Sequence, residues 1–288
     1  MRKIGLLLGG GGAKGAYQVG VLKAFEDAKI LRHVRVISGT SIGAINGFLL
    51  MNQLKVSSLK DIWATFNNDI IYGKNKWTET MSANGIYHVD GILERIKPFL
   101  NETGFRNTKI DGYVTTAKSL KRGLLASLNP KYLEKEVIHL NKSPDPLAAT
   151  LASAAIPLVF SQQEMDGARY VDGGLVDNFP LNPLLDAGAE IIISVGLSPK
   201  FVPTTPLLNK MWIDLTPYEE LGPMIRSMLD FSQTKLAIYE KNGYVAGRMM
   251  IRYLKSTKRL GFFGRLRFQK SRLITFKEVS EQGAIKKT

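Results

Sequence analysis

Short apolar runs alternate with amphipathic stretches along this chain. Residues 3–8 form an apolar run that ends in glycines, and beyond them Val19, Leu22 and Phe25 recur on one broad helix face. A second apolar run, at 36–37, is followed by a glycine-containing turn and then by small and apolar residues at helical spacing. The pattern predicts a strand, a turn and a helix twice in succession.

The same signals continue further along the chain. We expect helices at 90–100, 146–151 and 228–244, and strands at 113–117, 136–140 and 190–195. Helices interleaved with short buried strands predict an α/β fold of three layers with a largely parallel central sheet.

Aromatic and sulfur-containing side chains are scattered through residues 61–100. The segment forms either a cap that lines an apolar pocket for an acyl chain or ordinary core-facing helices and loops. The residues concerned are Trp63, Phe66, Tyr72, Trp77, Met81, Tyr87 and Phe99.

The turn at residues 39–43 reads G-T-S-I-G and joins a predicted strand to a predicted helix. In a G-x-S-x-G nucleophile elbow, the serine occupies a sharp, strained turn, and the flanking glycines remove side chains that would clash there. Ser41 is therefore the candidate nucleophile, with Gly39 and Gly43 as supports of the elbow.

A glycine-rich stretch at residues 9–15 joins the first predicted strand to the helix after it. Backbone amides at a helix N-terminus are unpaired and bind anions. The amides of Gly10, Gly11 and Gly12 are therefore candidates for an oxyanion hole, which stabilises the negative oxygen of a tetrahedral intermediate. Residues expected to support this loop are Lys14 and Gly15.

The same loop matches the G-x-G-x-x-G fingerprint of a dinucleotide-binding Rossmann fold at Gly10, Gly12 and Gly15. That interpretation requires an Asp or Glu about 20 residues on, where the chain has residues 35–38 without a carboxylate. A phosphate-binding Walker loop fails as well, because Lys14 is followed by glycine instead of Ser or Thr. Nucleotide binding stays open as an alternative on the glycine loop alone.

Asp172 is the best acidic candidate for a partner of the serine, and the D-G-G run that it opens is either functional or an ordinary turn signal. It ends a strand-like run and precedes Gly173 and Gly174, which let other backbone approach closely. No histidine follows it, since the three lie at 33, 88 and 139, so the Ser-Asp-His order of an α/β-hydrolase cannot be assembled around Asp172. Asp111 with His139 keeps that order, but both are expected to be surface or internally satisfied residues.

The 288 residues include no cysteine, which excludes a disulfide framework, a thiolate metal site and a cysteine nucleophile. No run approaches the roughly 18 apolar residues of a membrane-spanning helix, and the first residues are typical of a strand rather than of a signal peptide. We expect a cytoplasmic protein, with a peripheral position at the inner membrane face left open.

Positive charge is concentrated at the C-terminal end. Of the formal net charge of +14, residues 251–288 hold +9, from eleven Lys or Arg and two Glu. These cations are interleaved with Phe and Leu, so the segment is either a solvated basic face or an interfacial anchor for an anionic membrane. Nucleic acid is not expected as a partner, because no nucleic-acid motif accompanies the charges.

Three motifs stand in one order along the chain: G-G-G-x-K-G, then G-T-S-I-G, then D-G-G with N-F-P close behind. Together with A-S-A-A-I-P at 152–157, they resemble the patatin-like phospholipase family from the first strand to about Val195. The resemblance implies a Ser-Asp dyad in which Ser41 corresponds to the nucleophile and Asp172 to its base. It also implies a patatin-like catalytic domain over 1–250. The basic, aromatic-containing extension over 251–288 is a candidate for packing on that domain.

We therefore expect a serine-dependent lipid acyl hydrolase, of the phospholipase A or lysophospholipase type, that cleaves membrane-lipid esters through an acyl-enzyme. An aspartate with its ordinary pKa of about 3.9 is a weak base, so Asp172 needs burial or close placement beside the serine. No metal or organic cofactor is implied, and calcium as an aid to membrane binding stays open. The alternatives are a Rossmann-type nucleotide-binding protein and a non-catalytic membrane-binding module.

Overall fold

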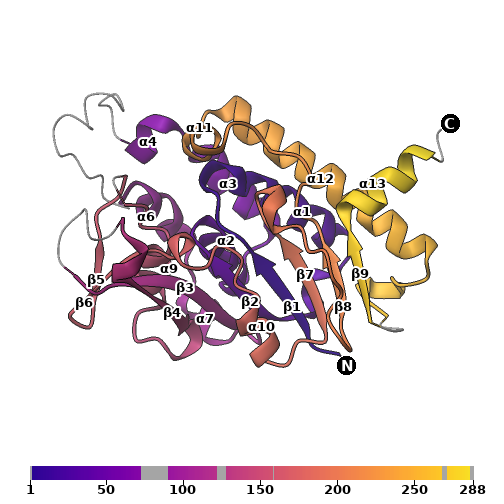
Figure 1. Cartoon of the computed structure of the whole chain (residues 1–288), viewed down its shortest axis with the longest axis horizontal. Coiled ribbons are helices and arrows are strands. Elements are labelled where there is room, and N and C mark those ends of the chain that lie inside the picture. The colour runs from indigo at the N-terminus through magenta and orange to yellow at the C-terminus, as the bar shows by residue number, and fades with distance from the viewer. Residues whose placement is uncertain (1, 73–89, 122–127, 158, 268–270, 286–288) are drawn as a thin grey trace.

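The computed structural model describes residues 2–72, 90–121, 128–157, 159–267 and 271–285 (Figure 1). The strands are β1 (Ile4–Leu8), β2 (Val34–Thr40), β3 (Asp111–Ser119), β4 (Leu133–His139), β5 (Gln163–Met165), β6 (Ala168–Asp172), β7 (Ile191–Val195), β8 (Met211–Asp214) and β9 (Arg272–Thr275). Within the described residues they form one sheet in the order β5-β6-β3-β2-β1-β7-β8-β9, and β4 pairs with β3 beside that row. The row is parallel from β3 to β9, whereas β3 pairs antiparallel with β4 and β6, and β5 with β6.

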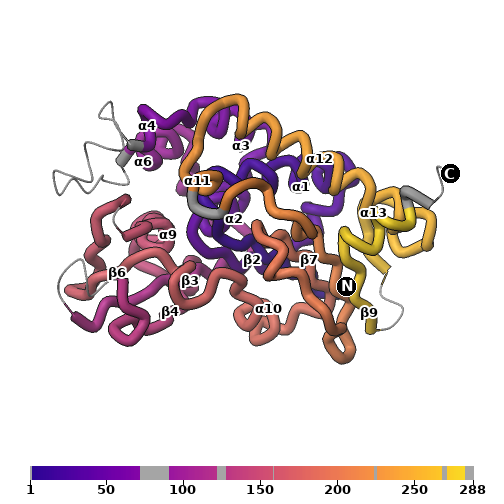
Figure 2. The backbone as a smooth tube through the Cα atoms, turned by 45° about the horizontal axis from the view of Figure 1, so that its top comes forward, coloured from indigo at the N-terminus to yellow at the C-terminus, as the bar shows by residue number. Residues whose placement is uncertain are grey.

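Helices cover both faces of this sheet. They are α1 (Gly15–Asp27), α2 (Ile42–Met51), α3 (Val56–Thr65), α4 (Asn68–Tyr72), α6 (Asp90–Ile96), α7 (Glu102–Arg106), α9 (Pro146–Ser153), α10 (Asn182–Asp186), α11 (Met224–Leu229), α12 (Gln233–Ser256) and α13 (Phe276–Ile285). The larger core includes buried residues of α1, α2, α3 and α12, and a smaller core on the other face packs α10 against β1, β2, β7 and β8. Figures 1 and 2 show these two layers with the sheet between them. The predicted α/β fold with a largely parallel sheet is confirmed.

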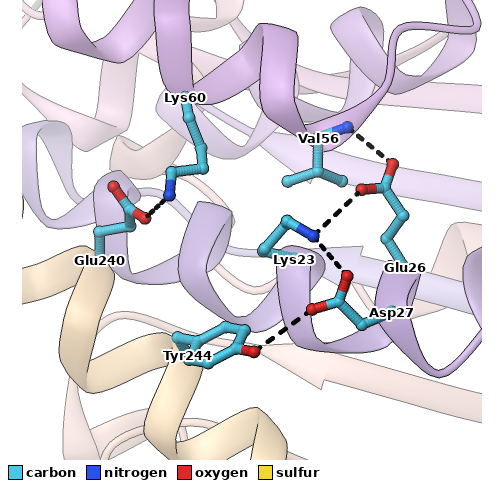
Figure 3. A network of polar contacts seen from close by, with 7 residues as sticks. All are labelled: Lys23, Glu26, Asp27, Val56, Lys60, Glu240 and Tyr244. Atoms are coloured by element: carbon cyan, nitrogen blue, oxygen red, sulfur yellow. Dashed lines mark hydrogen bonds and ion pairs between the residues drawn. The ribbon is translucent and has the colours of Figure 1, made fainter.

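Polar contacts join α1, α3 and α12 at the edge of the larger helix layer (Figure 3). Glu26 of α1 accepts a hydrogen bond at 2.8 Å from the amide of Val56, the first residue of α3, and a carboxylate stabilises a helix N-terminus. Lys60 of α3 pairs with Glu240 of α12 at 2.8 Å. Solvent-exposed ion pairs contribute only about 0–1 kcal/mol each, so this layer depends mainly on the packing beneath them.

Helices α1 and α12 pack with their backbones in contact. A Cβ atom added at Gly20 would collide with the carbonyl oxygen of Glu240, and one added at Gly243 would collide with the carbonyl oxygen of Tyr17. Glycine is required at such positions because any larger residue would separate the two backbones. This contact fixes α1, and with it the glycine-rich loop at its N-terminus, against α12.

The C-terminal segment is continuous with the rest of the fold. The proposed boundary after residue 250 falls inside α12, and β9 extends the sheet beside β8. Between α12 and β9, an isolated β-bridge joins Leu260 to Leu266. We call residues 260–267 the basic-aromatic turn. Phe262 and Phe263 at its tip are 87% and 65% exposed. His33 Nε2 lies 2.7 Å from the carbonyl oxygen of Phe263, which ties the turn to the chain just before β2.

The prediction of one helix over 228–244 is wrong. Helix α11 ends at Leu229 and α12 begins at Gln233, because Asp230 and Ser232 between them adopt extended backbone angles. The Asp230 carboxylate accepts the amide of Ser232 at 3.0 Å, a local bond that competes with the helical ladder. Among the described residues, no helix is both long enough and apolar enough to cross a bilayer.

Candidate active site

Strand β3 brings the ends of two other strands together. One edge of β3 pairs first with β2 and then with β6, while β4 occupies the opposite edge. Strand β2 runs parallel to β3 and ends at Thr40 opposite Thr115, whereas β6 runs antiparallel and ends at Asp172 opposite Thr116. Because Thr115 and Thr116 are adjacent, the carboxyl ends of β2 and β6 face each other. Ser41 and Asp172 therefore meet at this junction.

The backbone of Ser41 is strained. Its φ of 55° and ψ of −127° lie where non-glycine residues are rarely found, at a cost of order 1–3 kcal/mol. A Cβ atom at Gly39 would come within 2.8 Å of the Ala44 backbone, and one at Gly43 would collide with the carbonyl oxygen of Leu8. The turn has the geometry of a nucleophile elbow, with both flanking glycines in close contact with backbone.

The Ser41 hydroxyl donates to Asp172 Oδ2 at 2.5 Å. Both residues are 5% exposed, and the other carboxylate oxygen accepts the amide of Gly174 at 2.7 Å. Burial raises the pKa of Asp172 to about 6, against the two hydrogen bonds that favour its ionised form. A carboxylate of this kind is a stronger base than a free aspartate and is still mostly ionised at neutral pH.

The glycine-rich loop lies over the serine, since a Cβ atom at Gly10 would be 3.0 Å from Ser41 Cβ. The amide of Gly10 donates to the carbonyl oxygen of Asn178 at 3.3 Å. Hydrogen bonds among the described residues include none from the amides of Gly11 and Gly12. Within the described part of the chain, the amides of Gly11 and Gly12 therefore have no acceptor, whereas Gly10 must exchange an existing, long hydrogen bond to serve an oxyanion.

Two buried amide side chains hold the ends of this loop. Gln18 Nε2 donates to the carbonyl oxygens of Gly9 and Val195 at 2.8 and 3.1 Å. Asn46 Nδ2 donates to Gln18 Oε1 at 2.9 Å, and Asn46 Oδ1 accepts from Trp63 Nε1 at 3.0 Å. Neither residue was predicted from the sequence. The available signal was a polar amide inside an otherwise apolar helical segment.

Asn178 lies between the glycine-rich loop and the Asp172 turn. Its Nδ2 donates to the carbonyl oxygen of Gly10 at 3.3 Å. A Cβ atom at Gly174 would come 2.8 Å from Asn178 Oδ1, and one at Gly173 would collide with the Thr115 carbonyl oxygen. Asn178 belongs to the N-F-P motif, but no role was predicted for it from the sequence.

Lys14 is buried, with a relative exposure of 2%. Its Nζ lies 3.4 Å from Glu220 Oε2, and Glu220 Oε1 accepts the hydroxyl of Ser198 at 2.9 Å. Next to Lys14, a Cβ atom at Gly15 would come 2.6 Å from the side chain of Ile42. These contacts favour the predicted supporting role of Lys14 and Gly15, which stays a prediction.

The alternative triad is not assembled. His139 stacks on Tyr113 with ring centroids 4.6 Å apart, and its Nε2 lies 3.8 Å from Asp111 Oδ1. Asp111 pairs with Val36, about five residues before Ser41 along β2, which is roughly 16 Å. At this distance, Asp111 and His139 cannot exchange a proton with Ser41.

Part of the aromatic segment belongs to the core. Trp63 and Phe66 are buried, and both rings pack against Phe231 with centroids 6.4 and 6.2 Å apart. The residues of this segment that lie outside the described part of the chain are Trp77, Met81, Tyr87 and His88.

A second buried carboxylate, Asp214, lies at the end of β8. It accepts the hydroxyls of Ser194 and Thr216 at 2.6 and 2.7 Å, and burial raises its pKa to about 7. With no exposed surface it is a structural residue. In the described ranges, no three His, Asp or Glu side chains are grouped so that they could hold a metal ion.

Comparison with known proteins identifies sequence relatives. A family model described as patatin-like phospholipase matches residues 6–185. The lysophospholipase nte1 of Aspergillus terreus is 30% identical over 208 residues, 68% of this chain and 12% of that protein. An uncharacterised NTE family protein of Mycobacterium bovis is 26% identical over 198 residues, 68% of this chain and 49% of that protein. The chain thus matches half or less of the length of these curated relatives.

Among solved structures, human GIVD cytosolic phospholipase A2 is similar with a TM-score of 0.51 and 9% sequence identity. The match covers 89% of this chain and 60% of that one. At this identity the likeness concerns the fold alone.

Proposed function

The chain belongs to the patatin-like phospholipase family, and from this premise we propose that it is a serine lipid acyl hydrolase of the phospholipase A or lysophospholipase type. The observation that supports this function most directly is the 2.5 Å hydrogen bond from Ser41 to Asp172. Its position at the carboxyl end of a parallel strand agrees with acyl-transfer chemistry, as does the adjacent loop, whose Gly11 and Gly12 amides have no acceptor among the described residues.

In the first half of the proposed reaction, Asp172 takes the hydroxyl proton while Ser41 Oγ attacks the ester carbonyl carbon. Amides of Gly11 and Gly12, with Gly10 after it leaves the Asn178 carbonyl, donate to the oxyanion. Collapse of the intermediate breaks the ester C–O bond. The alcohol leaves with the proton from Asp172, and the acyl group stays on Ser41.

In the second half, Asp172 takes a proton from water, and the resulting hydroxide attacks the acyl carbonyl. The Ser41 oxygen leaves and recovers the proton from Asp172, so a fatty acid is released and the dyad is restored. No histidine takes part, and no step requires a metal.

Reaction with a fluorophosphonate probe tests the nucleophile. We expect labelling of the wild type, none of Ser41→Ala, and labelling slowed by at least about 100-fold in Asp172→Asn, because the base is lost. Ser38→Ala is the matched control, because it removes a buried hydroxyl of β2, the strand that ends just before Ser41. Within the described residues, that hydroxyl has no hydrogen-bond partner. Equal labelling of Ser41→Ala and wild type would contradict the assignment.

The substrate class is tested by fatty-acid release. The matched relative from Aspergillus terreus is named a lysophospholipase, and we propose a single-chain lysophospholipid as the preferred substrate. Release from lysophosphatidylcholine and from phosphatidylcholine would be compared at equal concentration, with Ser41→Ala as blank. Faster release from the two-chain lipid would favour the phospholipase A type instead.

We also propose that the basic-aromatic turn meets an anionic membrane surface. Two exposed phenylalanines stand at its tip, and Lys258, Arg265 and Arg267 around them are exposed. Such cations contribute about 1 kcal/mol each near an anionic membrane. Sedimentation with anionic and neutral vesicles should show salt-sensitive binding that decreases when Phe262 and Phe263 are both replaced by Ser. Leu208→Ser, at a residue 83% exposed elsewhere, is the control. Equal binding to both vesicle types would contradict this proposal.

A further inference from the structure

A short segment at the end of α9 contacts the backbone of both Ser41 and Asp172. Ser153 Oγ accepts the amide of Ser41 at 2.9 Å and donates to the carbonyl oxygen of Thr115 at 2.7 Å. Two residues later, the carbonyl oxygen of Ala155 accepts the amide of Asp172 at 2.9 Å. One three-residue segment therefore holds the backbone of the nucleophile and the backbone of its base.

These contacts matter because β2 and β6 do not pair with each other. The two strands meet end to end, and each takes its register from β3. No ladder crosses the junction between Ser41 and Asp172 in the described sheet. The distance between the two catalytic side chains therefore depends on β3, on the segment from Ser153 to Ala155, and on the hydrogen bond from the Thr40 hydroxyl to the carbonyl oxygen of Asp177.

Burial makes the Ser153 contact costly to lose. Ser153 and Thr115 have no exposed surface, and Ser41 is 5% exposed. Without the Ser153 hydroxyl, the amide of Ser41 would be a buried donor with no acceptor. A strained backbone such as that of Ser41 persists only where its surroundings hold it. The Ser41 amide is held by Ser153, and the neighbouring Thr40 hydroxyl donates to the carbonyl oxygen of Asp177 at 2.9 Å.

We propose that Ser153 is a positioning residue of the reaction, which keeps Ser41 Oγ in reach of Asp172 by holding the Ser41 amide. The proposal rests on the proposed function, because it requires Ser41 to be the nucleophile. It assigns no contact between Ser153 and substrate. The A-S-A-A-I-P run at 152–157 thereby takes part in catalysis through its serine.

The test compares Ser153→Ala with wild type on a chromogenic ester. We expect kcat to fall about 10- to 100-fold, the loss that a displaced reacting group produces, while KM changes less than about threefold. Ser153→Cys keeps the size and a weak acceptor, so its kcat should lie between the two. Thr150→Val is the matched control, since it removes another fully buried hydroxyl of α9, bonded at 2.8 Å to Pro146, and should keep the wild-type kcat.

The pH profile separates positioning from general loosening. If Ser153 only positions Ser41, Asp172 stays buried in Ser153→Ala. The midpoint of the rise in activity on the acid side of the pH profile is then the same as in wild type. A midpoint that moves toward the ordinary aspartate value near 4 would mean that water has entered the site, and would overturn the proposal.

Other outcomes are equally decisive. A wild-type kcat in Ser153→Ala, or an equal loss in Thr150→Val, would overturn the proposal. If Ser153→Ala does not fold, a wild-type kcat in Ser153→Cys overturns it and a reduced kcat supports it. Ser41→Ala, measured alongside, distinguishes failure of the proposed function from failure of this inference. Activity retained in Ser41→Ala contradicts the proposed function. Activity lost in Ser41→Ala but retained in Ser153→Ala contradicts this inference alone.

Discussion

At the scale of single residues, Asp172 combines two properties that oppose each other. A base must be ionised at the working pH, yet burial favours the neutral carboxyl and raises the pKa of Asp172 to about 6. The hydrogen bonds from Ser41 and from the amide of Gly174 limit that rise. As the proposed base, Asp172 is therefore mostly ionised near neutral pH and needs no histidine.

This pKa predicts the pH dependence of the reaction. Only ionised Asp172 can accept the serine proton, so kcat/KM for a soluble ester should rise with pH through a midpoint near 6. Initial rates between pH 4 and 9 measure it. Asp214→Asn is the control, because Asp214 is a buried carboxylate with a pKa of about 7 on β8, which β1 and β7 separate from β2. Loss of the midpoint in that variant would mean that the wrong carboxylate has been assigned.

The same pKa predicts a change in stability for Asp172→Asn. The folded pKa of about 6 exceeds the unfolded value of about 3.9, so the stabilisation from the protonated carboxyl is complete below pH 4 and is lost as pH rises through 6. Neutral Asn avoids this loss. At pH 8 the free energy of unfolding should increase by up to about 3 kcal/mol.

Chemical denaturation at pH 8 and at pH 4 measures that change, and the difference between variant and wild type should shrink at the lower pH. A variant that is less stable than wild type at both pH values would show that the hydrogen bonds of Asp172 outweigh the cost of its burial.

Sequence motifs predicted Ser41, Asp172 and the glycines because each carries a local signal, a serine or acid beside residues that permit tight turns. Ser153, Asn178 and Gln18 carry no such signal. Their roles depend on contacts with residues far away in the sequence, such as the 112-residue separation between Ser41 and Ser153. Small buried polar residues of this kind cannot be told from packing residues before the fold is known.

At the scale of elements, the contact between α1 and α12 supports a stability prediction. Replacing Gly243 by Ala places a methyl group against the Tyr17 carbonyl, and overpacking typically costs about 1–3 kcal/mol. The better helix propensity of Ala recovers about 1 kcal/mol, so a net loss is expected. Thermal unfolding measures it. Val245→Ala, at a residue 47% exposed on the same helix, is the control and should change little. Equal melting temperatures for Gly243→Ala and wild type would mean that the helices can separate freely.

Strand–turn–helix units could be predicted element by element because their periodicity is local. The direction of β6 could not be predicted from the sequence, since a short strand pairs with whichever strand edge is free. Here the free edge belongs to the second half of β3. The position of β9 was also missed: its four residues follow the basic-aromatic turn, and their pairing with β8 is visible only in the assembled sheet.

At the scale of the whole molecule, the dyad and the basic-aromatic turn lie at opposite ends of the central strands. Ser41 follows the carboxyl end of β2, whereas His33, which contacts the turn, precedes its amino end. The seven residues of β2 span roughly 23 Å. A membrane bound by the turn would therefore leave the dyad facing away from it.

This geometry predicts that anionic vesicles bind the protein without blocking its active site. Hydrolysis of a soluble chromogenic ester should proceed at the same rate with and without saturating vesicles, while sedimentation confirms that the protein is bound. Strong inhibition by the vesicles would mean that the membrane covers the carboxyl ends of the strands, and the turn would then not be the anchor.

The end-to-end meeting of β2 and β6 also bears on how the protein acquires activity. Ser41 and Asp172 are 131 residues apart, and they come together only after β3 has paired with both strands. Contacts at such sequence separation form slowly relative to local helices. During refolding, reactivity toward a fluorophosphonate should therefore appear after the helical signal, so that the first turnover marks the completion of the sheet.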